Sequence, residues 1–79
     1  MKINVGVIFG GRSVENEISV ITAAQTMAAM NTEKYNIVPI YISKDGRWYT
    51  GDKLRTTDNY RNLDALLKSV TEVYLRPVY

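Results

Sequence analysis

The stretch "VIFGGRSVENEISV", residues 7–20, determines the fold class that we predict for this chain. Its β-branched and aromatic residues predict a strand over residues 3–9, and the near-continuous apolar run is typical of a strand covered on both faces. Gly10 and Gly11 end that strand, because glycine readily leaves the extended conformation. The stretch therefore begins with a buried strand and a tight glycine turn.

A helix is predicted to follow the turn, over residues 14–30. Ser13 offers a side-chain oxygen as a cap, and Glu15 and Glu17 fall in the first turn, where the helix dipole favours negative charge. Four residues mark one apolar side of this helix and four more widen it: Val14, Ile18, Ile21 and Ala28, then Val20, Ala24, Met27 and Met30.

A second strand and a hairpin come next. Residues 35–43 are rich in Ile, Val and Tyr, and Pro39 among them indicates an edge position or an irregular spot, because proline cannot donate a ladder hydrogen bond. Asp45-Gly46 is a strong hairpin-turn signal. We therefore expect residues 47–50 to return as a short antiparallel strand.

The last third of the chain predicts a polar loop that can include one helical turn over residues 51–61, a short helix over 62–70 and a third principal strand over 72–79. The resulting order of strand, helix, strand, hairpin, helix and strand predicts an α/β fold. Its βαβ start should have a right-handed crossover and parallel pairing. Because the chain stops on an apolar, aromatic strand, we expect the fold to be truncated there and a longer protein to continue.

Composition narrows the classes of function. The 79 residues are 46% hydrophobic and 23% charged, which is typical of one globular domain. The net charge of +2 arises from ten basic and eight acidic residues without a basic run, so we expect no nucleic-acid partner. With no Cys and no His, the chain has no disulfide framework, no thiolate metal site and no histidine base. The first apolar stretch is too short for a membrane span and lacks a signal-peptide cleavage pattern, so we expect a cytoplasmic protein without membrane contact.

The glycine turn is the candidate site. Ligands in open α/β sheets bind beyond the carboxyl ends of the strands, often at the first strand-to-helix turn. Gly10 and Gly11 allow close approach of a ligand, and free N–H groups at the helix start could hold an anion. The dinucleotide fingerprint and the P-loop motif are both absent from the sequence. From these residues alone, a tight connection that binds nothing is an equally good interpretation.

Glu15 also has two interpretations. A carboxylate near a helix N-terminus gains roughly a few tenths of a kcal/mol from the dipole, and a capping box would need Glu or Gln where Asn16 stands. Alternatively, Glu15 faces the cleft and receives a cationic group such as a substrate ammonium. Ser19 lies four residues later on the same helix face and could support that carboxylate. Glu17 is expected to face solvent or to pair with a Lys or Arg.

The stretch "VGVIFGGRSVENEISV" resembles the start of D-alanine–D-alanine ligases, whose N-terminal signature reads roughly F-G-G-x-S-x-E-H-E-[VI]-S. The following "ITAAQTMAAMNTEKYNIVPIYISKDGRWYTG" is similar to the family's usual helix, second strand and hairpin, so the resemblance covers essentially the whole chain. Asn16 stands where the family often has His. The resemblance implies a Rossmann-like, three-layer pre-ATP-grasp domain with a mostly parallel sheet. Residues 1–79 would form this N-terminal, substrate-binding domain, and the ATP-grasp domains would be absent from the chain.

The resemblance also implies a reaction. ATP, with Mg²⁺ or Mn²⁺, would phosphorylate one D-alanine, and the second would attack the acyl phosphate to give the dipeptide of peptidoglycan. D-alanine and ATP would be partners of the full-length enzyme, which we expect to be a homodimer, whereas this chain alone would bind no ATP or metal and be inactive. Glu15 matches the glutamate that binds the ammonium of the first D-alanine. The residues expected beside it are Gly10, Gly11, Arg12 and Ser13 as the wall of the site and Ser19 as a support, with no metal ligand.

Two other functions stay open on the sequence. One is a stand-alone Rossmann-like module that binds a partner or associates with itself, without catalysis. The other is the N-terminal domain of an ATP-grasp enzyme that acts on a different amino or hydroxy acid. In either ligase case, the choice of D-alanine, D-lactate or D-serine as acceptor is set largely outside this segment.

Overall fold

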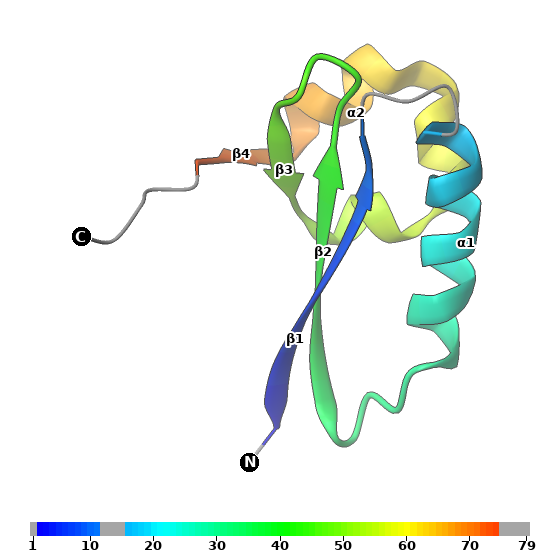
Figure 1. Ribbon diagram of the computed structural model, residues 1–79, viewed down its shortest axis with the longest axis vertical. Coiled ribbons are helices and arrows are strands. Elements are labelled where there is room, and N and C mark those ends of the chain that lie inside the picture. The colour runs from blue at the N-terminus through cyan, green and yellow to red at the C-terminus, as the bar shows by residue number, and fades with distance from the viewer. Residues whose placement is uncertain (1, 12–15, 75–79) are drawn as a thin grey trace.

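The computed structural model describes residues 2–11 and 16–74, which form a four-stranded sheet with helices packed on it (Figure 1). The strands, in their order across the sheet, are β1 (Ile3–Gly10), β2 (Tyr35–Ile42), β3 (Trp48–Thr50) and β4 (Thr71–Val73). The helices are α1 (Asn16–Ala29), the 3₁₀ helices η1 (Asp52–Arg55) and η2 (Thr57–Asn62), and α2 (Leu63–Ser69). This order of elements is the predicted one, with two 3₁₀ helices where a loop with one helical turn was expected.

The sheet is parallel only in its first pairing. β1 and β2 run parallel over all eight residues, from Ile3 opposite Tyr35 to Gly10 opposite Ile42. β2 with β3, and β3 with β4, are antiparallel. A parallel neighbour needs a crossover connection, which the short turn between β2 and β3 cannot provide. The prediction of a mostly parallel sheet is therefore confirmed only for the βαβ start.

The hairpin turn lies where Asp45-Gly46 predicts it. Gly46 has a φ of 87°, its N–H donates to the carbonyl of Ser43 at 2.9 Å, and the N–H of Ser43 donates to the carbonyl of Arg47 at 2.8 Å. Positive φ at glycine is the conformation that such a turn requires. β3 then begins at Trp48, one residue later than predicted.

Pro39 lies at a local edge of the sheet, which is one of the two predicted alternatives, although β2 has neighbours on both sides further along. The register of β2 with β1 is unbroken at Pro39, so the alternative of an irregular spot is not supported. The β2–β3 ladder covers only Ile40 to Ile42 on β2, so Pro39 lies just beyond its end. The Pro39 carbonyl accepts a hydrogen bond from Thr50 Oγ1 at 2.9 Å, in place of a backbone partner. The missing N–H of proline therefore costs the ladder nothing at this position.

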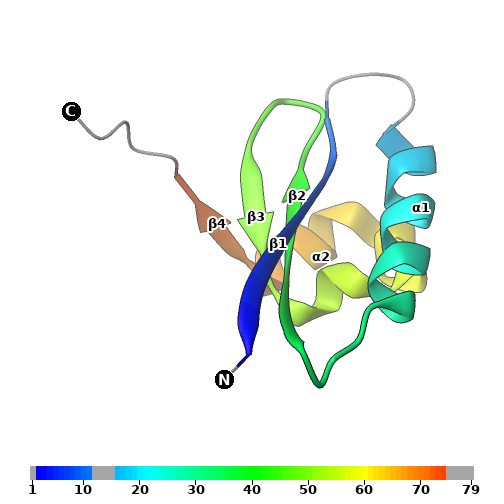
Figure 2. The ribbon, with the colours of Figure 1, turned by 60° about the horizontal axis from the view of Figure 1, so that its bottom comes forward.

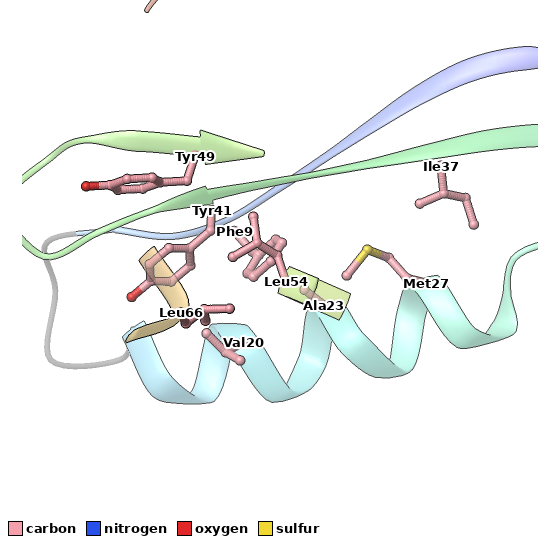
Figure 3. Close-up of a cluster of buried hydrophobic side chains, with 9 residues drawn as sticks. All are labelled: Phe9, Val20, Ala23, Met27, Ile37, Tyr41, Tyr49, Leu54 and Leu66. Atoms are coloured by element: carbon pink, nitrogen blue, oxygen red, sulfur yellow. The ribbon is translucent and has the colours of Figure 1, made fainter. Parts of the chain in front are cut away.

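One hydrophobic core joins the sheet to the helices. Phe9, Tyr41 and Tyr49 lie opposite one another in the register of β1, β2 and β3, and thus on the same face of the sheet. Figure 3 shows these side chains and the helical residues that pack with them. The whole buried cluster consists of Phe9, Val20, Ala23, Met27, Ile37, Tyr41, Tyr49, Leu54 and Leu66. Since α1, η1 and α2 all contribute to this one cluster, they cover the same face of the sheet (Figure 2).

The opposite face of the sheet carries Ile8, which is 57% exposed, and the half-buried Ile40 and Trp48. Within residues 2–11 and 16–74 no helix packs on this face, so these residues form two layers and the predicted third layer is not among them. The last predicted strand is shorter than expected, since β4 ends at Val73, and residues 75–79 lie outside the described part of the chain.

The buried face of α1 is only partly the predicted one: Val20 and Met27, which were predicted to widen the apolar side, are buried, and Met30 packs against the core. Ile18, Ile21 and Ala28 were predicted to mark the apolar side of the helix, and this prediction is wrong. Ile18 and Ile21 are 64% and 52% exposed, and Ala28 is exposed too. Val14 lies outside the described residues. Apolar residues surround this helix on most sides, so their periodicity does not select one face. The residues of α1 that are buried in the structure are Asn16, Val20, Ala23 and Met27.

Candidate functional site

The glycine turn lies at the carboxyl end of β1, beside the end of β2. Gly10 and Gly11 have φ values of 92° and 111°, which strongly favour glycine. A Cβ on Gly10 would lie 2.3 Å from the carbonyl oxygen of Ile42 and 2.9 Å from the ring of Tyr41. A Cβ on Gly11 would meet no described atom within 4 Å. Gly10 therefore permits close approach to β2, whereas a side chain at Gly11 would meet nothing among the described residues.

Backbone N–H groups of this turn are already hydrogen-bonded. The Gly10 N–H donates to Ser19 Oγ at 2.9 Å, and the Gly11 N–H donates to the carbonyl of Ile42 at 2.8 Å. Neither N–H is free for a ligand. The expected anion site at the helix start involves residues 12–15, which lie outside the described residues, so it stays a prediction. What Gly10 and Gly11 can provide is a rigid, closely packed wall.

Asn16, the first residue of α1, is the functional candidate that the sequence did not indicate. It is 2% exposed, and its Nδ2 donates to the carbonyls of Gly11 at 2.7 Å and Ile42 at 3.2 Å. Its Oδ1 accepts from the hydroxyl of Tyr41 at 2.9 Å. Figure 3 shows Tyr41 pointing from β2 toward the start of α1. The only sequence signal for a buried Asn16 is its spacing with Val20 on one helix face.

The structure describes three of the predicted site residues and brings them together. Gly10 and Ser19 share a hydrogen bond, and Gly11 follows Gly10 in the turn. Arg12, Ser13 and Glu15 lie outside the described residues, so their predicted roles stay predictions. Ser19 was expected to support Glu15, and the structure shows that its hydroxyl oxygen supports the turn backbone.

Glu17 forms an ion pair with Lys44 of the hairpin, 2.6 Å between Oε1 and Nζ, and both side chains are exposed. The hydrogen bond from Lys44 lowers the pKa of Glu17, and the same bond raises the pKa of Lys44. This agrees with the expectation that Glu17 faces solvent or pairs with a basic residue. Burial raises the pKa of Tyr41, so its hydroxyl stays protonated and able to donate to Asn16.

Two hollows border the start of α1, one on each side. A groove of about 490 Å³ between β1 and α1 is lined in part by Gly10, Ser19 and the exposed Ile8. A second hollow of about 390 Å³ lies toward η2 and is lined in part by Asn16 and Tyr41. The wall formed by the glycine turn therefore has space for a small molecule beside it.

The part of the chain that the structure describes shows no group of three or more Asp, Glu, His or Cys side chains that could hold a metal ion. None of the described helices is both long and apolar enough to cross a membrane.

Comparison with known proteins identifies the family of this chain. The family model described as "D-ala D-ala ligase N-terminus" matches residues 4–75, nearly the whole chain. The chain belongs to this family. A D-alanine–D-alanine ligase of Thermosipho melanesiensis is 44% identical over 71 residues, which cover 90% of this chain and 20% of that protein.

Two solved structures extend the family assignment to the fold. The D-alanine–D-alanine ligase of Coxiella burnetii superposes with a TM-score of 0.79 at 31% identity and covers 95% of this chain. The VanG D-Ala:D-Ser ligase of Enterococcus faecalis gives a TM-score of 0.67, also at 31% identity, over 81% of this chain. These matches confirm the predicted α/β fold class. This chain covers 22% and 20% of those two structures, so it spans about a fifth of its relatives' length.

Proposed function

We propose that residues 1–79 form the N-terminal, substrate-binding part of a D-alanine–D-alanine ligase and contribute to the site of the first D-alanine. The observation that carries the proposal is the family match over residues 4–75, which includes the glycine turn and the start of α1. The turn supports it, because its closely packed wall lies beside a hollow of the size that a small amino acid needs.

In this proposal Glu15 receives the ammonium group of the first D-alanine, and Gly10, Gly11, Arg12 and Ser13 form the wall beside it. Glu15 directly precedes Asn16, the buried first residue of α1. The positive end of the helix dipole keeps a carboxylate charged at this position, which is the form that pairs with an ammonium. The contribution of this segment is therefore to bind and orient a substrate. Ser19 supports the site by holding the backbone of the turn.

We propose that the longer protein joins two D-alanine molecules with consumption of ATP, for peptidoglycan synthesis in the cytoplasm. ATP and its Mg²⁺ or Mn²⁺ would be bound by residues outside this chain. By itself the chain should catalyse nothing. The longer protein is proposed to be a homodimer, and the sheet supports self-association, since within the described residues β1 is bonded on one side only.

A D-alanine–D-serine ligase is the second candidate. This chain is equally identical, at 31%, to the C. burnetii D-alanine–D-alanine ligase and to the E. faecalis D-Ala:D-Ser ligase. The segment therefore does not discriminate between the two acceptors, and both reactions need the same first D-alanine site. An assay of the longer protein that offers D-alanine and D-serine together decides between them.

A chimaeric enzyme tests the proposed function. The matching 71 residues of the T. melanesiensis ligase are replaced by those of this chain, and dipeptide formation is measured. We expect the chimaera to make D-alanyl-D-alanine. Glu15→Gln should raise the KM for the first D-alanine by about ten- to a hundredfold, the value of a lost charged hydrogen bond.

Glu17→Gln is the matched control, because it removes the same charge two residues later, where the carboxylate pairs with Lys44. It should leave the KM within about twofold of the parent. The proposal is wrong if a cooperatively folded chimaera makes no dipeptide. The role of Glu15 is wrong if both variants behave alike.

A further inference from the structure

We propose that Asn16 is a positioning residue for the first D-alanine site, because its side-chain amide ties the glycine turn to the end of β2. This inference rests on the proposed function. Asn16 is not expected to touch the substrate, and it would act through the backbone of Gly11 and through the neighbouring Glu15.

Both the nitrogen and the oxygen of the Asn16 side-chain amide have hydrogen-bond partners. An asparagine side chain has two N–H donors and a carbonyl acceptor. The donors reach the carbonyl oxygens of Gly11 and Ile42 at 2.7 and 3.2 Å, and the acceptor receives the Tyr41 hydroxyl at 2.9 Å. Among the described residues, no buried side-chain nitrogen or oxygen is left without a partner. The network is complete, and a complete buried network specifies one geometry.

These bonds hold the two chain positions that flank residues 12–15. Gly11 is fixed at both of its backbone groups, since its N–H donates to Ile42 and its carbonyl accepts from Asn16. Asn16 is bonded to the same Ile42 carbonyl. Gly11 and Asn16 are thus held to one another and to the end of β2. The candidate anchor, Glu15, is joined directly to this fixed point.

Stability alone does not explain an asparagine here. The neighbours of Asn16 on its helix face, Val20 and Ala23, are apolar core residues. Replacing a buried polar network by apolar side chains of similar shape is often close to neutral for stability. What an apolar residue cannot do is donate hydrogen bonds both to the carbonyl of Gly11 in the turn and to the carbonyl of Ile42 at the end of β2. The geometry therefore points to a role in holding the turn.

The test uses the chimaeric enzyme with Asn16→Asp, which keeps the shape but removes both amide donors. We expect the KM for the first D-alanine to rise about tenfold, while the KM for ATP changes less than about twofold. If Asn16 served only to fold the protein, the variant would lose maximal rate in proportion to the unfolded fraction and would keep its KM. Asn36→Asp is the matched control, since the Asn36 amide donates to Asn4 Oδ1 at 3.0 Å in an exposed position.

A second variant and a second measurement separate the outcomes. If Asn16→Asp does not fold, Tyr41→Phe is measured in its place. It removes only the hydroxyl that donates a hydrogen bond to Asn16 Oδ1, and it should raise the KM for the first D-alanine by about threefold. Hydrogen exchange at the Gly11 amide should be at least about tenfold faster in Asn16→Asp, whether or not the enzyme is active.

Equal KM values in the parent and the folded variant overturn the positioning role and leave the proposed function standing. For a chimaera that makes no dipeptide, the exchange rate at Gly11 decides. Faster exchange means that Asn16 does hold Gly11, although the proposed function is wrong. Unchanged exchange means that the positioning role of Asn16 is wrong as well as the proposed function.

Discussion

Replacing Gly10 by Ala should destabilise the chain far more than replacing Gly11. Both glycines have positive φ, at 92° and 111°, so each alanine adopts a backbone conformation that costs about 1–3 kcal/mol. At Gly10 the new Cβ would also lie 2.3 Å from the Ile42 carbonyl oxygen, and relieving such overpacking costs about another 1–3 kcal/mol. At Gly11 the Cβ would meet no described atom within 4 Å.

The two costs compare with the total stability of the chain. At roughly 0.05–0.15 kcal/mol per residue, 79 residues have a free energy of unfolding of about 4–12 kcal/mol. A loss of about 2–6 kcal/mol at Gly10, the sum of the strain and overpacking terms, can remove most of it. Urea unfolding followed by the fluorescence of Trp48, the single tryptophan, measures both variants in the 79-residue chain.

Gly11→Ala is the control because it shares the backbone cost and lacks the steric one. We expect its free energy of unfolding to exceed that of Gly10→Ala by about 1–3 kcal/mol, the overpacking term alone. If the two variants unfold at the same urea concentration with equal slopes, the close approach of Gly10 to β2 does not limit stability. The argument that the turn is a closely packed wall would then be wrong.

Two further outcomes follow from the ion pair and from the sheet. The ion pair lowers the pKa of Glu17, so its contribution to stability is fully present above the ordinary pKa of 4.5 and is lost as the pH falls through the lowered pKa. The same pair raises the pKa of Lys44, so its contribution is fully present below the ordinary pKa of 10.5 and is lost as the pH rises through the raised pKa. The melting temperature of Lys44→Ala should therefore lie below that of the parent between pH 4.5 and 10.5 and converge with it in strong acid, and a deficit that persists in strong acid would contradict the pairing. The chain should also sediment as a dimer at about 100 μM, a range in which exposed apolar surfaces associate. Ile8→Lys places a charge on the uncovered face of the sheet and should give a monomer. A parent chain that is already monomeric would refute self-association through this face.

The sequence predicts the parts of the fold that local signals determine. The strand before Gly10 and the hairpin at Asp45-Gly46 are where the pattern predicts them, because glycine at positive φ and runs of β-branched residues act within a few positions. The buried side of α1 could be predicted only in part, since Ile18 and Val20 are both apolar, and Val20 is buried in a cluster with residues of other elements, such as Tyr41 and Leu66. Pairing of β4 with β3 also depends on contacts between distant segments.

Asn16 shows why the candidate site was only partly predictable. Two of its partners, Tyr41 and Ile42, are 25 and 26 residues away along the chain, so no local pattern contains them. The capping-box rule assigns no role to Asn16, because it requires Glu or Gln at this position. A buried polar side chain becomes visible only when the second strand has been placed beside the first.

The hydrogen bonds of the turn also bear on which ligand chemistry it can serve. Glycine-rich turns that bind phosphate do so with unpaired N–H groups aimed at the ligand. Here the N–H groups of Gly10 and Gly11 are both occupied, by Ser19 and by the Ile42 carbonyl, so these two residues lack the feature that an anion would need. In the proposed function, recognition comes from a side chain set beside this backbone, and a carboxylate before α1 suits an ammonium group. The proposed cation site at Glu15, braced by Asn16, does not depend on these two N–H groups.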